Sequence, residues 1–363
     1  MLICVHDREK GNIEMKAVVY YAANDIRVEE RPAPQLNDNN MIAKVKCCAL
    51  CGTDLKIWTA GNPRCHPPRI LGHEMIAGIE QVGKNVKGFS PGEKITFATT
   101  IACNDCAYCA AGLQNVCPNS KPISYDFDGG LAEYIEVPAE AIAGGNVIKL
   151  AEDIGEEAAL CEPLSCAINS QEIVGVKEGD FVLVTGGGPL GAMQALLAKA
   201  NGAKRVALVG SSAARLKLLD GLEGVELIDG STTDVEKWIF GETNGLGADV
   251  VIVCAPVKSA MENALNYARK GGGISYFASL PSGKSELNLD SRLIHYKELR
   301  ICGASDSRPE HVQKAAELIG SGKIDLKQVI SHRLDLEEII TGLTLMKDRQ
   351  CLKVVLYPGG ITK

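Results

Sequence analysis

"VLVTGGGPLGAMQALLAKA", residues 182–200, is the stretch that decides the fold of this chain. Gly186, Gly188 and Gly191 form the pattern G-x-G-x-x-G, directly after an apolar strand-like run and directly before an apolar helix-like run. Glycine-rich turns are common, so the pattern alone is weak. Between a strand and a helix, however, it is typical of a dinucleotide-binding βαβ unit. We expect Gly186 to allow the tight turn, Gly188 to let the backbone approach a pyrophosphate, and Gly191 to allow close packing of helix on strand.

The surrounding sequence extends this unit into an α/β domain. The phosphates of a dinucleotide are expected at the N-terminus of the helix that begins near Pro189, with Leu190 in its first turn. From about residue 180 to 279, strand-like runs alternate with helix-like runs of about ten residues, which predicts a parallel sheet. Residues 15 to 150 instead read as short strands separated by turns, and "CLKVVLYP" near the C-terminus reads as a strand that returns to this first part. A chain of 363 residues is long for one core, so two domains are expected.

Composition and charge exclude several classes of protein. The chain has 46% hydrophobic and 23% charged residues, as is ordinary for a soluble α/β protein. Its net charge of −7 argues against nucleic acid or an anionic membrane as the main partner. It has no run of eighteen apolar residues, and charged residues follow its short apolar start, which is unlike a signal peptide. We therefore expect a cytoplasmic protein without a membrane partner.

"CNDCAYCAAGLQNVC", residues 103–117, predicts a structural metal site. Fourteen cysteines in a cytoplasmic chain favour thiolates and metal over disulfides. Free cysteines are also often buried small hydrophobes, which suits the apolar surroundings of Cys4, Cys47, Cys48, Cys254, Cys302 and Cys351. A polar loop does not suit that interpretation, and a C-x2-C step wraps the chain around one tetrahedral zinc; an iron–sulfur cluster is the competing hypothesis. A closed shell of four thiolates leaves no open position, so the zinc would be structural. Its ligands would be Cys103, Cys106, Cys109 and Cys117.

A second set of metal-ligand types is dispersed along the first part of the chain. "ALCGTDLKIW" contains Cys51, and "RILGHEMIAG" contains His73 and Glu74. "LCEPLSCA" contains Glu162, with Cys161 as a rival. Cys51 alone could be a core residue and His73 a satisfied buried histidine, but carboxylates in apolar segments seldom lack a partner. A mixed shell that leaves one position to water or substrate is the catalytic type of zinc site.

Taken together, these motifs resemble one family. "CGTDLKIW", "GHEMIAG", the 103–117 segment, "EPLSCA" and "GGGPLG" occur in the same order as in the zinc-dependent medium-chain dehydrogenases. The resemblance runs from about residue 16 onward, and "EPL" is similar to the polyol branch, which includes sorbitol and threonine dehydrogenases. It implies a GroES-like, mainly β catalytic domain over residues 1–165, completed by 303–363, and a Rossmann domain with a doubly wound parallel sheet over 166–302. It also implies a homodimer or homotetramer.

The resemblance assigns roles to single residues. Zinc would act as a Lewis acid on the substrate oxygen while hydride moves to the nicotinamide ring. Thr53 corresponds to the hydroxyl that passes the alcohol proton onward. Lys56 stands where many relatives have a histidine that completes this relay, and it is either a relay group or a solvated charge. The implied ligands of the catalytic zinc are Cys51, His73 and Glu74, with Glu162 bound directly or through water.

The expected activity is hydride transfer between NADP(H) and a secondary alcohol or ketone, a polyol or sugar derivative. The alternatives are an NAD-dependent threonine- or inositol-type dehydrogenase, and a non-enzymatic NADP-binding protein with a redox-sensing or structural role. We expect one catalytic and one structural zinc per chain and a small-molecule substrate. Ile57 stands where the polyol branch commonly has tyrosine, and "GASDSRPEH" has Asp306 and Ser307 where sorbitol dehydrogenases have an Arg-Tyr pair. The basic candidates for an anionic substrate are Arg64, Lys56 and Arg308.

The choice of nicotinamide cofactor depends on the end of the second strand, "RVALVG". An Asp or Glu about twenty residues after the glycine motif binds the adenosine ribose in NAD-dependent proteins. Here the strand ends at Gly210, followed by Ser211, Ser212 and then Arg215. Without the acid, two hydroxyls and an arginine can bind a 2′-phosphate, which predicts NADP. The alternative is that Ser211 only caps the next helix and that NAD binds.

Overall fold

The computed structural model describes residues 13–361. The expectations that concern the first twelve residues, a start without a signal peptide and a core position for Cys4, lie outside the described residues. Within the described part, no helix is long and apolar enough to cross a membrane.

The first part of the chain consists mainly of short strands, as its turn-rich sequence predicts. The strands are β1 (Glu14–Ala22), β2 (Asp25–Pro32), β3 (Met41–Ala49), β4 (Arg69–Ile70), β5 (Glu74–Val82), β6 (Lys94–Phe97), β7 (Thr100–Ile101), β8 (Lys121–Pro122), β9 (Tyr134–Val137) and β10 (Val147–Lys149). The helical segments among them are α1 (Gly52–Ala60), α2 (Ala107–Ala110), η1 (Gln114–Val116), α3 (Ala139–Ala143) and η2 (Glu156–Leu160).

The middle of the chain alternates between strands and helices. Its elements are α4 (Cys161–Val174), β11 (Phe181–Thr185), α5 (Pro189–Ala200), β12 (Arg205–Gly210), α6 (Ala213–Lys217), β13 (Glu226–Asp229), α7 (Val235–Glu242), β14 (Ala248–Val253), α8 (Lys258–Tyr267), β15 (Ala268–Tyr276), α9 (Ser291–Tyr296) and β16 (Arg300–Gly303). The last elements are α10 (Pro309–Gly320), η3 (Lys327–Val329), β17 (Ile330–Asp335), η4 (Leu336–Glu338), α11 (Ile339–Lys347) and β18 (Lys353–Tyr357).

The middle elements form a doubly wound parallel sheet with strand order β13-β12-β11-β14-β15-β16. All five residues of the central strand β11 are buried, because helices cover both faces of the sheet. Successive side chains of a strand point to opposite faces. Accordingly Val182 and Val184 pack with α4 and α5, whereas Phe181 and Leu183 pack with α7 and α8. This is the order in which the turn after the first strand faces the ligand crevice.

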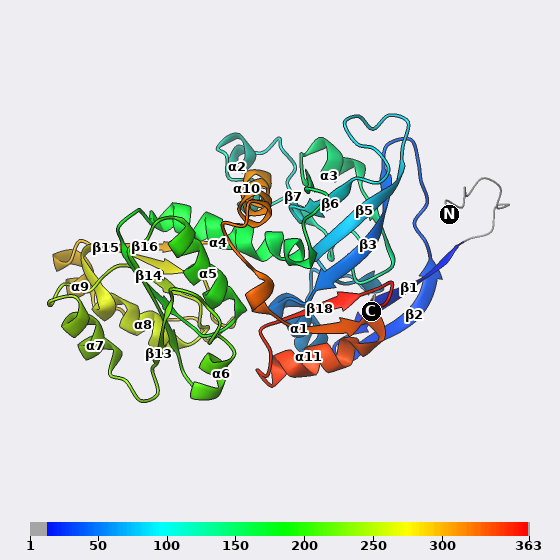
Figure 1. The fold of residues 1–363 in the computed structure, drawn as a ribbon. Coiled ribbons are helices and arrows are strands. Elements are labelled where there is room, and N and C mark those ends of the chain that lie inside the picture. The colour runs from blue at the N-terminus through cyan, green and yellow to red at the C-terminus, as the bar shows by residue number, and fades with distance from the viewer. Residues whose placement is uncertain (1–12, 362–363) are drawn as a thin grey trace.

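The mainly β part is completed by strands from the C-terminal part of the chain. Its largest sheet has the order β10-β6-β5-β3-β18-β17, with β9 beside β3. In this sheet β18 pairs antiparallel with β3, with Val355 opposite Ala49 and Leu356 opposite Cys48. The predicted return of "CLKVVLYP" to the first part of the chain is therefore observed, and the two parts lie as two lobes in Figure 1.

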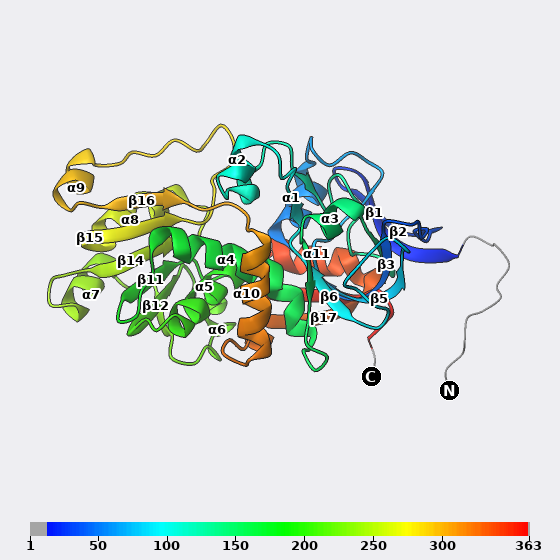
Figure 2. The ribbon, with the colours of Figure 1, turned by 90° about the horizontal axis from the view of Figure 1, so that it is seen from above.

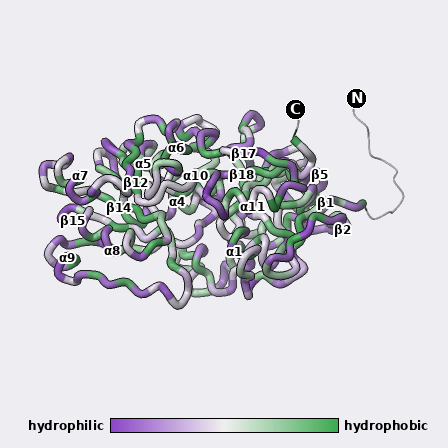
Figure 3. The backbone as a smooth tube through the Cα atoms, turned by 90° about the horizontal axis from the view of Figure 1, so that it is seen from below, coloured by the Kyte–Doolittle hydropathy of each residue, from purple (hydrophilic) through white to green (hydrophobic). Residues whose placement is uncertain are grey.

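Helix α4 joins the two lobes. Nearly all of its side chains are buried, and together with α10 it lies between the lobes in Figure 2. One hydrophobic core runs through this junction, because the same cluster contains Ile76 of β5 and Val182 of β11. In Figure 3 the long loop before α9 is largely hydrophilic, in contrast to the central strands. The predicted limit between residues 165 and 166 falls inside α4, so the exact domain limits stay predictions.

The packing of α5 on its strand makes Gly191 testable. A Cβ atom added at Gly191 would overlap the carbonyl oxygen of Gly186. Because this turn cannot relax without moving the strand, we expect Gly191→Ala to lower the free energy of unfolding by about 1–3 kcal/mol. Urea unfolding followed by circular dichroism measures the change. Gly221→Ala is the matched control, since a Cβ there would meet nothing within 4 Å. Equal midpoints for the two variants would contradict the argument.

Candidate active site and metal centres

The pairing of β3 with β5 brings the first dispersed metal-ligand types together. Ala49 of β3 lies opposite Glu74 of β5. Cys51 follows two residues after Ala49 as the N-cap of α1, and His73 directly precedes Glu74. One ligand atom from each of Cys51, His73 and Glu74 lies within 4.8 Å of the other two. A thiolate, an imidazole and a carboxylate at this spacing fit a zinc ion.

Asp54 lies next to both Cys51 and His73, and the sequence analysis did not predict a role for it. It is 1% exposed, and its Oδ2 accepts a hydrogen bond of 2.9 Å from the backbone N–H of Cys51. Its Oδ1 lies 3.8 Å from Nδ1 of His73, and neither atom has a hydrogen-bond partner among residues 13–361. Burial lowers the pKa of His73, but the charges of Cys51 and Asp54 outweigh burial and raise it well above its ordinary value. The available signal was an acid three residues after Cys51, in the first turn of α1.

Lys353 of β18 is the counter-charge of the cluster, and it too was missed. Its Nζ lies 2.5 Å from both carboxylate oxygens of Glu74 and donates to the Leu50 carbonyl at 3.2 Å. The two side chains are 3% and 0% exposed, respectively. Burial lowers the pKa of Lys353, but the charge of Glu74 raises it above its ordinary value. Glu74 is therefore held as one half of a buried ion pair.

Glu162 belongs to a second, neighbouring cluster. Ligand atoms of Glu162, Cys166 and Asp306 lie within 4.8 Å of one another, and Glu162 is not grouped with the cluster around Cys51. Cys166 is four residues after Glu162, on the same face of α4. Burial raises the pKa of Glu162 to about 7, although the charge of His73 opposes this shift. The rival ligand Cys161 is fully buried in the hydrophobic core instead.

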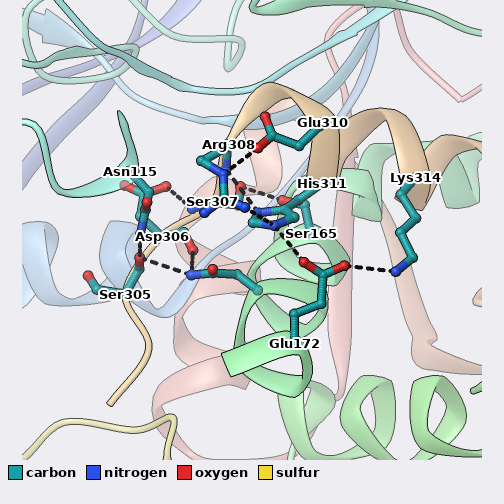
Figure 4. Close-up of polar contacts among 11 residues, drawn as sticks. Asn115, Ser165, Glu172, Ser305, Asp306, Ser307, Arg308, Glu310, His311 and Lys314 are labelled. Atoms are coloured by element: carbon teal, nitrogen blue, oxygen red, sulfur yellow. Dashed lines mark hydrogen bonds and ion pairs between the residues drawn. The ribbon is translucent and has the colours of Figure 1, made fainter. Parts of the chain in front are cut away.

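The segment that carries Asp306 is fixed by side chains from other elements (Figure 4). Asn115 Nδ2 donates to the Ser305 carbonyl at 2.9 Å, and the hydroxyls of Ser165 and Ser307 lie 2.6 Å apart. The backbone N–H of Ser307 donates to Asp306 Oδ1 at 2.8 Å. Asp306 has a φ of 58°, in the left-handed region that non-glycine residues seldom adopt. The position of its carboxylate is therefore built by tertiary contacts.

Of the basic candidates for binding an anion, Arg64 acts on the second cluster: burial raises the pKa of Asp306, and the charge of Arg64 is among the groups that oppose this shift. Arg308 donates to Glu310 and turns toward α10 (Figure 4). Lys56 is exposed on α1, and the Arg64 guanidinium lies 5.7 Å from the centre of the Tyr125 ring. None of these three shares a cluster with the metal-ligand types.

Thr53 and Ile57, for which the sequence analysis made predictions, also lie on α1. Thr53 is partly exposed in its first turn, two residues after Cys51. Ile57 is 0% exposed and packs in the core of the mainly β part. A side chain at position 57 therefore stabilises α1 rather than lining a pocket.

The four cysteines of the 103–117 loop converge at one point. The Sγ–Sγ distances are 3.4 Å for Cys103–Cys117, 3.5 Å for Cys106–Cys109, 3.8 Å for Cys106–Cys117 and 3.9 Å for Cys103–Cys109. Four thiolates at about 2.3 Å from a tetrahedral zinc would be about 3.8 Å apart. The loop therefore fits a zinc ion. All thirteen cysteines among the described residues are free. Cys47, Cys48 and Cys351 are buried, as expected, whereas Cys254 and Cys302 are only partly buried.

The glycine-rich turn has the geometry that its pattern predicts. Gly186 has a φ of 122°, and Gly188 caps α5, which begins at Pro189. A Cβ atom at Gly186 would lie 2.8 Å from the backbone nitrogen of Ala255. Leu190, in the first turn of α5, is 36% exposed. The turn thus presents bare backbone at a helix N-terminus, which fits a dinucleotide pyrophosphate.

The end of β12 differs in detail from the expectation. A Cβ atom at Gly210 would lie 2.6 Å from Cδ2 of Leu216, so packing of α6 also requires glycine there. Ser212, and not Ser211, caps α6: its side chain accepts a hydrogen bond of 3.2 Å from the Arg215 backbone. The alternative role that we considered for Ser211 was therefore wrong, and Ser211 is an exposed side chain.

Comparison with known proteins agrees with this architecture. Residues 37–147 match the alcohol dehydrogenase GroES-like domain, and residues 189–321 match the zinc-binding dehydrogenase domain. The L-threonine 3-dehydrogenase of Bacillus licheniformis is 33% identical over 90% of this chain and 94% of its own length. A sorbitol dehydrogenase of Halalkalibacterium halodurans is 29% identical over 95% of this chain and 99% of its own length.

Solved structures show the same fold. A zinc-binding dehydrogenase from Sinorhizobium meliloti, bound to NADP, has a TM-score of 0.89 and 30% identity over 95% of this chain and all of its own. An alcohol dehydrogenase from Escherichia coli CFT073, complexed with NADH, has a TM-score of 0.85 and 26% identity over 96% of this chain and all of its own. The chain therefore belongs to the zinc-dependent medium-chain dehydrogenases, among the alcohol and polyol dehydrogenases that include the threonine and sorbitol enzymes.

Proposed function

We propose that this enzyme transfers hydride between NADP(H) and a secondary alcohol or ketone of the polyol or sugar type. The observation that carries the proposal is the convergence of Cys51, His73 and Glu74 within 4.8 Å, close to a second cluster that contains Glu162. A zinc ion held there would polarise the substrate oxygen. The alcohol loses a hydride to the nicotinamide and a proton to solvent, and we propose that the Thr53 hydroxyl relays this proton by accepting it while it gives its own proton onward. Lys56 is exposed on the same helix, and its part in the relay stays a prediction.

Lys353 tunes the proposed metal site through Glu74. Both oxygens of Glu74 face the ammonium at 2.5 Å, so the carboxylate charge is already compensated. A carboxylate that is already paired with an ammonium neutralises less of the charge of a bound metal ion than an unpaired carboxylate does. The separate grouping of Glu162 supports a contact through water rather than a direct bond. The same clusters contain every ligand type that catalysis needs, which speaks against a non-enzymatic role.

The metal assignment predicts about two zinc ions per chain by mass spectrometry of the purified protein. Cys51→Ser should lose about one ion, and turnover should fall more than about 100-fold, because even outer-shell partners of a metal contribute about 10–100-fold. Cys103→Ser should lose the other ion and mainly lower stability. Cys302→Ser is the control, since its thiol lies against the Ile274 carbonyl in the parallel sheet. One ion or none in the unaltered protein, or full activity of Cys51→Ser, would refute the assignment.

The side chains around the proposed site favour a substrate without negative charge. Glu162 and Asp306 approach one another there, the buried Lys353 is already paired with Glu74, and the exposed Arg64 acts on Asp306. Carboxylates accept hydrogen bonds from hydroxyl or ammonium groups and repel phosphate. A neutral polyol fits this surface. An amino alcohol is the second candidate, because two carboxylates would favour an ammonium group.

Substrate pairs test this charge argument. We expect kcat/KM for neutral polyols to exceed that for their phosphate esters, and Asp306→Asn to raise the relative kcat/KM for the esters by about five- to tenfold. Glu236→Gln, an exposed position on α7, controls for net charge. Absorbance at 340 nm follows the reaction. A higher kcat/KM for phosphate esters than for neutral polyols in the unaltered enzyme would contradict the proposal of an uncharged substrate.

The cofactor end of the site supports NADP. Gly210 ends β12 without an acid, and the exposed Ser211 follows it. Asp229, the neighbour of Gly210 in the sheet, already accepts hydrogen bonds from the Ser231 backbone and hydroxyl at 2.9 and 2.6 Å. Both of these bonds fall on Oδ1, so Oδ2 keeps its capacity to accept a hydrogen bond, and the NADP proposal rests on Gly210 and Ser211 alone. The Sinorhizobium meliloti relative is bound to NADP, although the Escherichia coli one is complexed with NADH. A homo-oligomer and a cytoplasmic location remain expectations from the family.

We expect kcat/KM for NADP(H) to exceed that for NAD(H) by more than about tenfold, because a 2′-phosphate adds charge-assisted hydrogen bonds. Gly210→Asp would collide with Leu216, so Ser211→Asp is the cleaner variant, and it should abolish the preference. Ser321→Asp, an exposed position just after α10, is the matched control. An NAD preference in the unaltered enzyme, or an unchanged ratio in Ser211→Asp, would contradict the NADP proposal.

A further inference from the structure

The guanidinium of Arg215 bridges the two lobes. Arg215 lies in α6, which faces the end of α11 across the gap between the lobes in Figure 1. Its Nε donates to the Gly187 carbonyl at 2.9 Å. Its Nη1 donates to the carbonyls of Arg349 and Cys351 at 2.9 and 2.7 Å. Three of the five N–H groups of one side chain are thus bonded to backbone on both sides of the junction.

The two sides of this bridge are both parts of the proposed active site. Gly187 lies inside the glycine-rich turn. Arg349 and Cys351 lie between α11 and β18, and Cys351 is two residues before Lys353, the partner of Glu74. Arg215 therefore connects the turn that faces the cofactor with the strand that carries the counter-charge of the metal-ligand cluster.

The turn at Arg349 presents two backbone carbonyls to this cation. Arg349 has a φ of 58°, so the chain turns sharply just after α11. The last carbonyls of a helix and of the turn after it lack intrahelical partners, and a cation stabilises them. Hydrogen bonds from a charged donor are stronger than neutral ones. The guanidinium supplies two such bonds to this turn.

The remaining nitrogen, Nη2, points toward the cofactor side. It lies 3.4 Å from the position that a Cβ atom would take at Gly188, the N-cap of α5. The hydrogen bonds that the structure assigns to the Arg215 side chain within residues 13–361 use Nε and Nη1 only. A phosphate can therefore bind Nη2 while the other bonds stay in place, whereas a bidentate grip would displace a backbone carbonyl.

We propose that Arg215 is a positioning residue, a clamp that holds the glycine-rich turn against the segment leading into β18. The clamp is independent of the choice between NAD and NADP. Its loss loosens the junction and weakens binding of both cofactors. Contact of Nη2 with a 2′-phosphate is an additional role, and it rests on the proposed NADP specificity. This contact leaves the bonds of Nε and Nη1 to the backbone in place.

Hydrogen–deuterium exchange of the cofactor-free, zinc-containing enzyme tests the clamp. The amides of Asp348, Arg349, Gln350 and Leu352 are hydrogen-bonded within or next to this segment and report its opening. In Arg215→Lys and Arg215→Ala we expect exchange of these amides to rise about tenfold, because a lysine keeps the charge but not the fork of donors. In Arg205→Lys it should not change, since Arg205 bonds Glu226 and Glu242 within the parallel-sheet lobe.

Cofactor titrations separate the clamp from the NADP proposal. Dissociation constants of NAD and NADP, measured by protein fluorescence, should both rise in Arg215→Lys, and the rise for NAD measures the clamp because NAD has no 2′-phosphate. Faster exchange at 348–352 without any NADP preference in the unaltered enzyme supports the clamp and refutes NADP specificity. Unchanged exchange in both Arg215 variants, or exchange that rises equally throughout the chain, overturns the clamp. If adding NADP to the unaltered enzyme makes the amides at 348–352 exchange faster, the proposal that the Arg215 bonds stay in place in the NADP complex is wrong.

Discussion

The buried ion pair between Glu74 and Lys353 is the interaction on which the rest of the structure depends. Two charges that are almost fully removed from water are tolerated only when they are paired, and loss of one partner leaves the other uncompensated. The pair forms only if β18 lies beside β3, with Val355 opposite Ala49. In the neighbouring pairing of β3 with β5, the same Ala49 lies opposite Glu74, which brings Cys51 to His73. Closure of the sheet and assembly of the candidate metal site are thus one constraint.

Around this pair, the site is assembled from segments that are far apart in the chain. Helix α4 contributes Glu162 and Cys166, and the segment after β16 contributes Asp306. Asn115, from the cysteine loop, holds the backbone next to Asp306 through Ser305. The cysteine loop therefore also contacts the proposed substrate site, because Asn115 binds the backbone next to Asp306. A rigid frame of this kind positions reacting groups better than mobile loops do.

Local patterns sufficed to predict the fold class, the family and the convergence of the four loop cysteines, because a strand–glycine–helix unit and a C-x2-C spacing act over short distances. The partners that sequence reasoning missed are long-range ones. Lys353 is 279 residues from Glu74, and Arg215 is 136 residues from Cys351. Only the register of paired strands and the packing of the lobes bring such residues together. Gly210 shows the opposite case: a local pattern was recognised, but the contact with Leu216 that also requires glycine lies in tertiary packing.

The separation of Glu74 from Lys353 has a consequence for how the enzyme is made. At about 5–20 residues per second, a ribosome needs roughly 15–55 s to reach Lys353 after Glu74 has been synthesised. During that interval the carboxylate has no ammonium to pair with, whereas all four thiols of the cysteine loop are already present. The loop can therefore acquire its ion on the nascent chain, and the Cys51 cluster reaches its final charge only after release of β18. The position of one lysine in the chain thus sets how late the counter-charge of the Cys51 cluster is completed.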